Sequence, residues 1–217
     1  MLATLTASCH NNHQSLFPVG NVNTDLMPGP NDPATVAVPQ QALHRVMFRR
    51  AGLLPTLACV TNPYSCSIAG RSVLSVSGQT IADILRNSTI KVISRNHKMT
   101  LYELAWLLHN LLFQDGITAM EQCLRWGHIA PTSPDTLGCY PYTETDPHIL
   151  TALPDIFIAG NMKEFASKKV EIRGHCVLLV SVPKFSQTSS LVKISLKDLQ
   201  SQLISFDMEM DPDFLDR

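Results

Sequence analysis

The stretch PDIFIAGNMKEFASK, residues 154–168, places a polar side chain directly after a predicted strand. Residues 155–159 are apolar enough for a short buried strand, and Gly160 and Asn161 follow it at once. Many α/β enzymes present a catalytic or metal-binding group just beyond the end of a strand. The first question is therefore whether Asn161 belongs to a working site or to a site whose chemistry is missing.

The familiar nucleophile and phosphate-binding motifs do not occur in the sequence. A serine nucleophile on a strand-to-helix turn follows the pattern G-x-S-x-G, and the nearest stretch, SVSGQ at residues 75–79, lacks the first glycine. No glycine-rich phosphate loop of either common kind is present. A cysteine nucleophile stays open as an alternative, although none of the six cysteines has a distinguishing context.

Histidines and cysteines give little support for a metal site. The cysteines are scattered without the C-x-x-C pair that a closed zinc site normally needs. His10 and His13 have the spacing of one helix face, but Asn11-Asn12 between them disfavours a helix. Five further histidines are isolated, as is usual for packed or surface positions: His97, His109, His128, His148 and His175. We therefore expect no metal and no cofactor.

Length and composition indicate a globular protein of about one domain. The chain has 217 residues, of which 45% are hydrophobic and 16% are charged, and a chain of this kind can bury a sizeable core. The net charge of −1 gives no overall attraction to nucleic acid or to an anionic membrane. We expect no signal peptide, no membrane span and reduced cysteines, because neither a basic start nor a long apolar run is present.

Helical and strand patterns are both present, which predicts an α+β fold. The predicted helices are residues 39–45, 80–88, 99–114 and 117–126, and Thr100 and Glu103 form a capping box at the start of the third. The predicted strands are residues 57–61, 66–68, 73–76, 155–159, 170–173, 176–183, 191–196 and 203–206. Ala69-Gly70 is the predicted turn of a hairpin, and the apolar run CVLLVSVP predicts a strand covered on both faces.

One loop, GHIAPTSPDTLGCYPY at residues 127–142, is rich in proline and glycine. Such a loop has few conformations to lose on folding and is therefore stiff. It suits either recognition of a partner or a structural crossover.

At this loop the sequence becomes recognisable. HIAPTSPDTLGCYPYTETDPHIL and the following PDIFIAGNMKEFASKKVEIRG resemble the small (B) subunits of DNA polymerase delta, within the B-subunit family of DNA polymerases alpha, delta and epsilon. DLMPGPNDP and VTNPYSCSIAGRSVLSVSGQTIADILRNS agree in the same order, so that the resemblance covers residues 24–206. It implies a partial calcineurin-like phosphoesterase β-sandwich with flanking helices, in a family regarded as having lost catalysis.

The resemblance also answers the first question. An active phosphoesterase would carry G-N-H-[DE] at Gly29-Pro30-Asn31-Asp32 and G-H-x-H at Gly160-Asn161-Met162-Lys163. An amide and an ammonium thus replace two imidazole ligands, and Lys163 would repel a divalent cation. The positions of the degenerate site are Gly29, Asn31, Asp32, Gly160, Asn161 and Lys163. We expect no catalytic residue there, and Asn31 with Asp32 would make at best a weak metal site.

The resemblance divides the chain into three parts. We expect residues 1–24 to be a polar, poorly ordered leader, residues 25–206 to be the C-terminal portion of the inactive domain, and residues 207–217 to be an acidic tail. Residues 92–114 have no counterpart in the family as we align it. The small subunits of the family begin with an OB-fold region and the first phosphoesterase strands, and this sequence shows neither. The chain therefore resembles a fragment, a splice form or an incomplete gene product.

The expected function is that of a nuclear accessory subunit without catalytic activity. By resemblance it bridges the cysteine-rich C-terminal region of the polymerase delta catalytic subunit to the other small subunits, and it meets DNA only within that assembly. Residues 39–48 and one loop are candidate contacts; the loop positions are Pro131, Pro134, Asp135, Leu137, Tyr140 and Pro141. The alternatives are a small subunit of polymerase alpha or epsilon, a phosphoesterase with a rebuilt site around Asn31, Asp32, Asn161 and His128, and a fragment that folds poorly.

Overall fold

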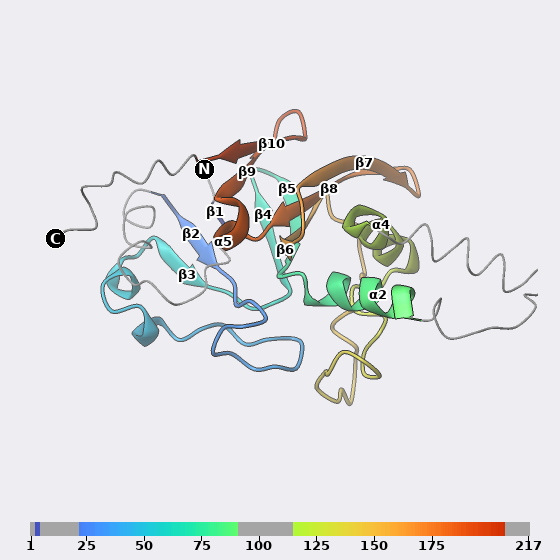
Figure 1. Cartoon of the computed structure of the whole chain (residues 1–217), viewed down its shortest axis with the longest axis horizontal. Helices are drawn as coiled ribbons and strands as arrows, with labels where there is room; N and C mark the ends of the chain where they lie inside the picture. The colour runs from blue at the N-terminus through green and yellow to red at the C-terminus, as the bar shows by residue number, and fades with distance from the viewer. Residues whose placement is uncertain (1–2, 5–21, 91–114, 207–217) are drawn as a thin grey trace, which may run out of the picture.

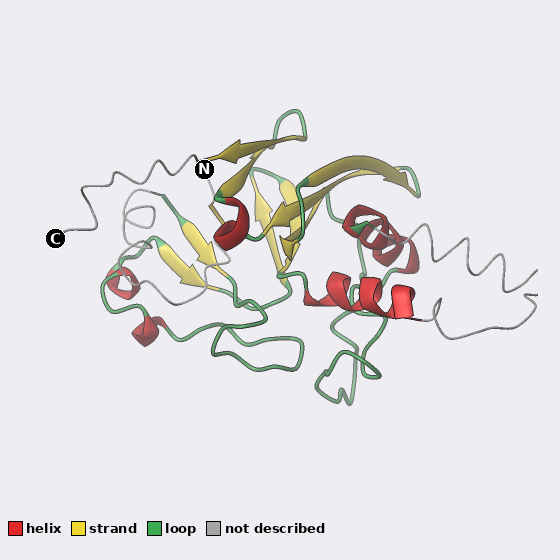
Figure 2. Cartoon of the chain, viewed as in Figure 1, coloured by secondary structure: helices red, strands yellow, loops and turns green. Residues whose placement is uncertain are grey.

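A computed structural model of the chain describes residues 3–4, 22–90 and 115–206. These residues contain sheets and a few helices joined by long loops (Figure 2), which confirms the α+β class. The predicted helix at 99–114, the unmatched stretch 92–114, the acidic tail and most of the polar leader lie outside the described residues. Among the described helices, none is long and apolar enough to cross a membrane.

A five-stranded sheet forms the centre of the molecule (Figure 1), with the strand order β4-β5-β6-β8-β7. Its strands are β4 (Tyr64–Ile68), β5 (Arg71–Val76), β6 (Ile156–Met162), β7 (Ala166–Ile172) and β8 (His175–Pro183). The three inner strands run parallel, and the two outer strands are antiparallel to their neighbours. The carboxyl ends of β5 and β6 therefore lie side by side.

Each face of this sheet is covered by a different element. On one face α2 (Gln79–Ile90) and α4 (Gly116–Trp126) pack on Phe157 and Leu179. On the other face the hairpin β9 (Ser190–Ser195) and β10 (Gln200–Ser205) packs on Ile156 and Leu178 (Figure 1). Successive residues of a strand point to opposite faces, so both cores draw on the same strands.

The predicted double coverage of the strand CVLLVSVP is confirmed. Residues 177–181 of β8 are all buried, and Val177 and Val180 belong to opposite cores. Burying an apolar side chain of this size contributes on the order of 1.5–3 kcal/mol before the loss of conformational entropy is subtracted. The strand is thus the centre of the fold.

A smaller parallel sheet lies beside the first and contains β1 (Ala3–Thr4), β2 (Thr24–Leu26) and β3 (Leu57–Cys59). Two short 3₁₀ helices, η1 (Arg45–Met47) and η2 (Ala51–Leu53), connect β2 to β3. A further single-turn helix, α5 (Phe185–Thr188), precedes β9. Figure 2 shows the long loops after β2 and after α4 on the same side of the molecule, away from the β9–β10 hairpin.

The local predictions have different outcomes. The Ala69-Gly70 hairpin is confirmed, because both residues have positive φ angles, 49° and 78°, as a two-residue turn with two left-handed residues requires. The helix at 117–126 is also confirmed; Asp115 caps its N-terminus by accepting from the Thr118 N–H, and Gly127 ends it in a left-handed conformation.

The prediction of a helix at residues 39–45 is wrong. The backbone of Gln40 pairs with Asn62 in an antiparallel bridge, which holds this segment extended. Helical structure begins only at η1, where the His44 side chain accepts a hydrogen bond from the Val46 N–H. The strand predicted at 57–61 is present but ends earlier, at Cys59.

Candidate functional site

Asn161 lies on a distorted strand end. Instead of stopping at Ala159, β6 continues to Met162 with a shift of register against β8 between these two residues. Asn161 itself has a φ angle of 55°, in the left-handed region that asparagine tolerates better than most residues. Its Nδ2 donates a hydrogen bond to the Ser77 carbonyl oxygen at 3.0 Å, just beyond the end of β5.

The turn at residues 29–32 lies against Asn161. Asp32 Oδ2 accepts a hydrogen bond from the Gly29 N–H at 2.7 Å. A methyl group added at Gly29 would lie 3.2 Å from Asp32 Oδ2 and 3.4 Å from Asn161 Nδ2. The two motifs singled out in the sequence, more than 100 residues apart, therefore meet in the fold.

The two motifs do not supply a set of cation ligands. Asp32 is engaged with its own turn, the Asn161 amide acts as a donor to Ser77, and Asn31 and Lys163 are exposed. Within residues 22–90 and 115–206, no group of three His, Cys, Asp or Glu side chains could hold a metal ion. Gly29 and Gly160 are buried and contribute backbone only.

His128, the further residue considered for a rebuilt site, is held elsewhere. Its Nδ1 accepts from the Ala130 N–H at 3.1 Å, so a neutral ring carries its proton on Nε2 and donates to Asp146 Oδ2 at 2.9 Å. Both ring nitrogens are thus engaged. This arrangement weighs against a role for His128 as a metal ligand beside Asn161.

Four uncharged side chains that the sequence reasoning missed form a hydrogen-bonded cluster near Asn161. We call it the amide network, and its members are Gln40, Asn62, Ser77 and Gln79. Asn62 Nδ2 lies 2.8 Å from Gln40 Oε1, 2.7 Å from Ser77 Oγ and 2.9 Å from Gln79 Oε1. Asn62 Oδ1 also accepts from the Ser77 N–H at 3.1 Å.

Three of the four members of the amide network are deeply buried, and Gln79 is half-buried. Gln40 and Asn62 are each 2% exposed, and Ser77 is fully buried. Burying polar groups without partners is unfavourable, so their mutual hydrogen bonds are a condition for this core to form. In the sequence Asn62 precedes Pro63, a pair that favours a turn or loop, but this pattern gives no sign of a buried amide.

The stiff loop at residues 131–141 lies at the surface and is held by contacts with α2 and with Val38. Of the six candidate contact residues, Leu137 is partly exposed and the other five, Pro131, Pro134, Asp135, Tyr140 and Pro141, are exposed. The Thr136 hydroxyl donates to Asp83 Oδ2 on α2 at 2.6 Å. At its other end Cys139 forms a parallel bridge with Val38. The loop therefore displays apolar groups on a fixed backbone.

A His–Asp–His cluster lies beside the base of this loop. His148 is buried, its Nδ1 is 3.2 Å from Asp146 Oδ1, and its backbone N–H donates to the same oxygen at 2.8 Å. Burial lowers the pKa of His148, although the Asp146 charge opposes the shift. Partial burial acts to raise the pKa of Asp146, but the hydrogen bonds from His128 and from the His148 backbone lower it overall. Asp146 thus favours its ionised form beside a buried imidazole, His148, that favours its neutral form.

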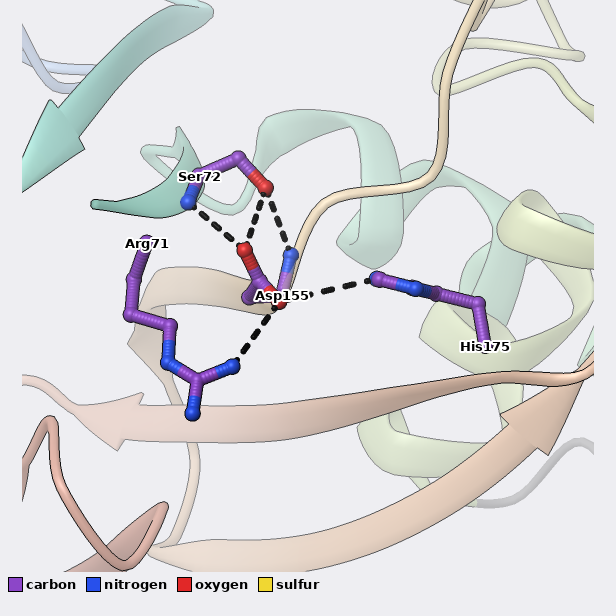
Figure 3. A network of polar contacts seen from close by, with 4 residues as sticks. All are labelled: Arg71, Ser72, Asp155 and His175. Atoms are coloured by element: carbon purple, nitrogen blue, oxygen red, sulfur yellow. Dashed lines mark hydrogen bonds and ion pairs between the residues drawn. The ribbon is translucent and has the colours of Figure 1, made fainter.

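A second polar cluster joins the starts of the parallel strands (Figure 3). Asp155 Oδ2 accepts from both the backbone N–H and the hydroxyl of Ser72, each at 2.8 Å, and Arg71 lies 3.3 Å from Oδ1. The Ser72 backbone N–H, then its hydroxyl and Arg71, hold the pKa of Asp155 below its ordinary value against the opposing effect of burial. His175 is more distant, with Nε2 3.7 Å from Oδ1. This cluster fixes β5 against β6 at the end of the strands opposite to Asn161.

Comparison of the sequence with known proteins assigns the chain to a family. The sequence model of the DNA polymerase alpha/epsilon B-subunit family matches residues 4–167. The chain belongs to this family. The predicted resemblance is thereby confirmed.

Curated proteins named as subunits of DNA polymerase delta align with most of the chain. A Drosophila melanogaster protein named DNA polymerase delta subunit 2 is 38% identical over 186 residues, which are 85% of this chain and 38% of the relative. The DNA polymerase delta small subunit of Saccharomyces cerevisiae is 35% identical over 199 residues, which are 87% of this chain and 40% of the relative. The Arabidopsis thaliana protein of the same name is 33% identical over 190 residues, which are 87% of this chain and 38% of the relative. The chain spans about two fifths of the length of these relatives.

Proposed function

We propose that this chain is an accessory subunit of DNA polymerase delta that acts in DNA replication and repair synthesis without catalytic activity of its own. The observation that carries the proposal is the 33–38% identity to delta small subunits over 85–87% of the chain. On this proposal it works in the nucleus. It bridges the cysteine-rich C-terminal region of the catalytic subunit to the other small subunits, and it meets DNA only as part of that assembly.

The geometry around Asn161 supports a role in binding instead of chemistry. Asp32 Oδ2 accepts a hydrogen bond from the Gly29 N–H, and Asn161 Nδ2 donates one to the Ser77 carbonyl oxygen. A scaffold needs a rigid surface with apolar groups and no reactive group. The loop at 131–141 meets this requirement, with Tyr140 exposed to 40%.

Capture by the three replicative catalytic subunits tests the proposal. The full chain should be retained by the C-terminal region of the polymerase delta catalytic subunit and not by those of alpha or epsilon. Tyr140→Ala should weaken binding by about tenfold, as expected for an aromatic residue central to an interface. Leu53→Ala is the matched control, because Leu53 is also apolar and 83% exposed but lies outside the loop.

Equal retention by all three catalytic subunits would contradict the assignment to delta. Equal losses in the Tyr140 and Leu53 variants would contradict the role of the loop. The absence of catalysis is tested separately with a generic phosphodiester and Mn²⁺. Turnover that disappears in Asp32→Ala would overturn it and favour the phosphoesterase alternative.

A further inference from the structure

The amide network joins parts of the chain that are far apart in sequence. Gln40 Nε2 donates to the Thr35 carbonyl oxygen at 2.8 Å and lies 3.4 Å from that of Gly29, so it fixes the loop after β2. Through Asn62 the network reaches Ser77 beyond β5, and the Ser77 carbonyl in turn accepts from Asn161 beyond the centre of β6. The loop after β2 is therefore tied to the ends of two central strands.

The same segment carries the stiff loop. Val38, two residues before Gln40, donates its N–H to the Gly138 carbonyl oxygen at 3.0 Å. Its carbonyl oxygen accepts from the Tyr140 N–H at 3.2 Å and from the Tyr142 hydroxyl at 3.1 Å. Val38 is itself 1% exposed. Three hydrogen bonds thus join the end of the loop to the backbone of Val38, and the amide network fixes the same segment through the buried side chain of Gln40.

The chemistry of the network makes it independent of ions. All four members are uncharged, so neither a bound cation nor a change of protonation is needed to keep them in place. The members of the network also share partners, because Gln40 Oε1 accepts hydrogen bonds from both Asn62 and Gln79 at 2.8 Å. Loss of the Gln40 amide removes the hydrogen bonds that it makes to Asn62, to Gln79 and to the Thr35 carbonyl oxygen, whereas Asn62 Nδ2 keeps Ser77 Oγ and Gln79 Oε1.

We propose that Gln40 and Asn62 are positioning residues that hold the loop at 131–141 in its partner-binding conformation, and that they do so without a metal ion. This inference rests on the proposed function of the loop as a contact surface. Neither residue touches the partner. Both act through the Val38 backbone.

Hydrogen exchange of the whole chain tests the positioning directly. Gln40→Met keeps the volume and removes the hydrogen bonds, so the Val38 and Tyr140 amides should exchange about tenfold faster. Ser181→Ala is the matched control, because Ser181 is 3% exposed and its Oγ donates to the Glu164 carbonyl oxygen at 2.8 Å, away from the loop. In the control the same two amides should stay within about twofold of the parent.

A milder variant keeps the test decisive if Gln40→Met does not fold. Gln79→Met removes the hydrogen bond to Gln40 and those that Gln79 Oε1 accepts from Asn62 and Ser77. Because Gln79 is only half-buried and leaves Gln40 in place, the same amides should exchange only a few-fold faster. Addition of EDTA should leave the exchange of the parent chain unchanged. Unchanged exchange in the variants, equal acceleration in Ser181→Ala, or acceleration by EDTA would each overturn the inference.

Capture by the delta catalytic subunit separates this inference from the proposed function. A folded Gln40→Met chain with fast exchange should bind about tenfold more weakly than the parent. If it binds as tightly as the parent, the network does not position a binding loop, although the proposed function stands. If the parent itself is not captured, the proposed function fails, and the exchange data still decide whether the network orders the loop.

Discussion

Replacing Asp155 by asparagine should destabilise the central sheet in a pH-dependent way. The carboxylate accepts two hydrogen bonds from Ser72 at 2.8 Å, and its side chain is only 16% exposed. Hydrogen bonds to an ionised, mostly covered acceptor are worth more than neutral ones, by roughly a factor of two. Arg71 adds little, because its side chain is 40% exposed and the ion pair is screened. We expect Asp155→Asn to lower the free energy of unfolding by about 2 kcal/mol at pH 7.

The pH dependence follows from the sign of the pKa shift. The pKa of Asp155 is lower in the folded chain than its ordinary value of 3.8. The stabilisation is therefore complete well above pH 3.8 and is lost as the pH falls through the folded pKa. The difference in the free energy of unfolding between the parent and Asp155→Asn should be constant near neutral pH and should become smaller in acid.

Urea unfolding at pH 7 and in acid measures this difference in the free energy of unfolding. Asp135→Asn is the control, because Asp135 is exposed on the loop, and a surface change of this kind alters stability by less than about 0.5 kcal/mol. An Asp155→Asn chain as stable as the parent at pH 7 would refute the reasoning. So would a loss that remains undiminished at the lowest pH at which the parent is folded.

Two further predictions concern backbone conformation and a buried histidine. Gly78→Ala should lower the free energy of unfolding by about 3 kcal/mol or more, because Gly78 has a φ of 94° and an added Cβ would overlap the Gly160 carbonyl oxygen. Gly174→Ala is the control, since Gly174 has a φ of 77° but no atom lies within 4 Å of the added Cβ. Thermal unfolding of this control should show a loss of only about 1 kcal/mol. Comparable losses would contradict the close approach. The pKa of His148 is lowered from 6.5, so the unfolded chain takes up the proton first and stability falls as the pH drops below about 6.5. His148→Gln should show a shallower decline between pH 7.5 and 5 in urea unfolding, and an identical slope would contradict this cause.

Local sequence signals predicted those elements whose stability is local or strongly patterned. The Ala69-Gly70 turn and the apolar run of β8 each leave a signature within a few residues. The prediction of a helix around Gln40 was wrong because the backbone of Gln40 pairs with that of Asn62. Such a distant pairing overrides a weak local preference for helix.

The candidate site was predictable only in part, for a similar reason. The motifs at Gly29 and Gly160 could be found from the family resemblance, and the fold brings them together. The amide network could not, because glutamine and asparagine on irregular segments have no periodicity and are usually exposed. Only the three-dimensional pairing of Gln40 with Asn62 shows that they are buried.

The parallel pairing of β5 with β6 has a consequence for how this chain tolerates changes in length. These neighbouring strands are joined by the long crossover between Val76 and Ile156. The entropy of closing such a connection grows only with the logarithm of its length. A stretch as long as residues 92–114 therefore adds only about 0.3 kcal/mol to the closure. Insertions within the crossover can be gained or lost while the strands that frame Asn161 stay in register.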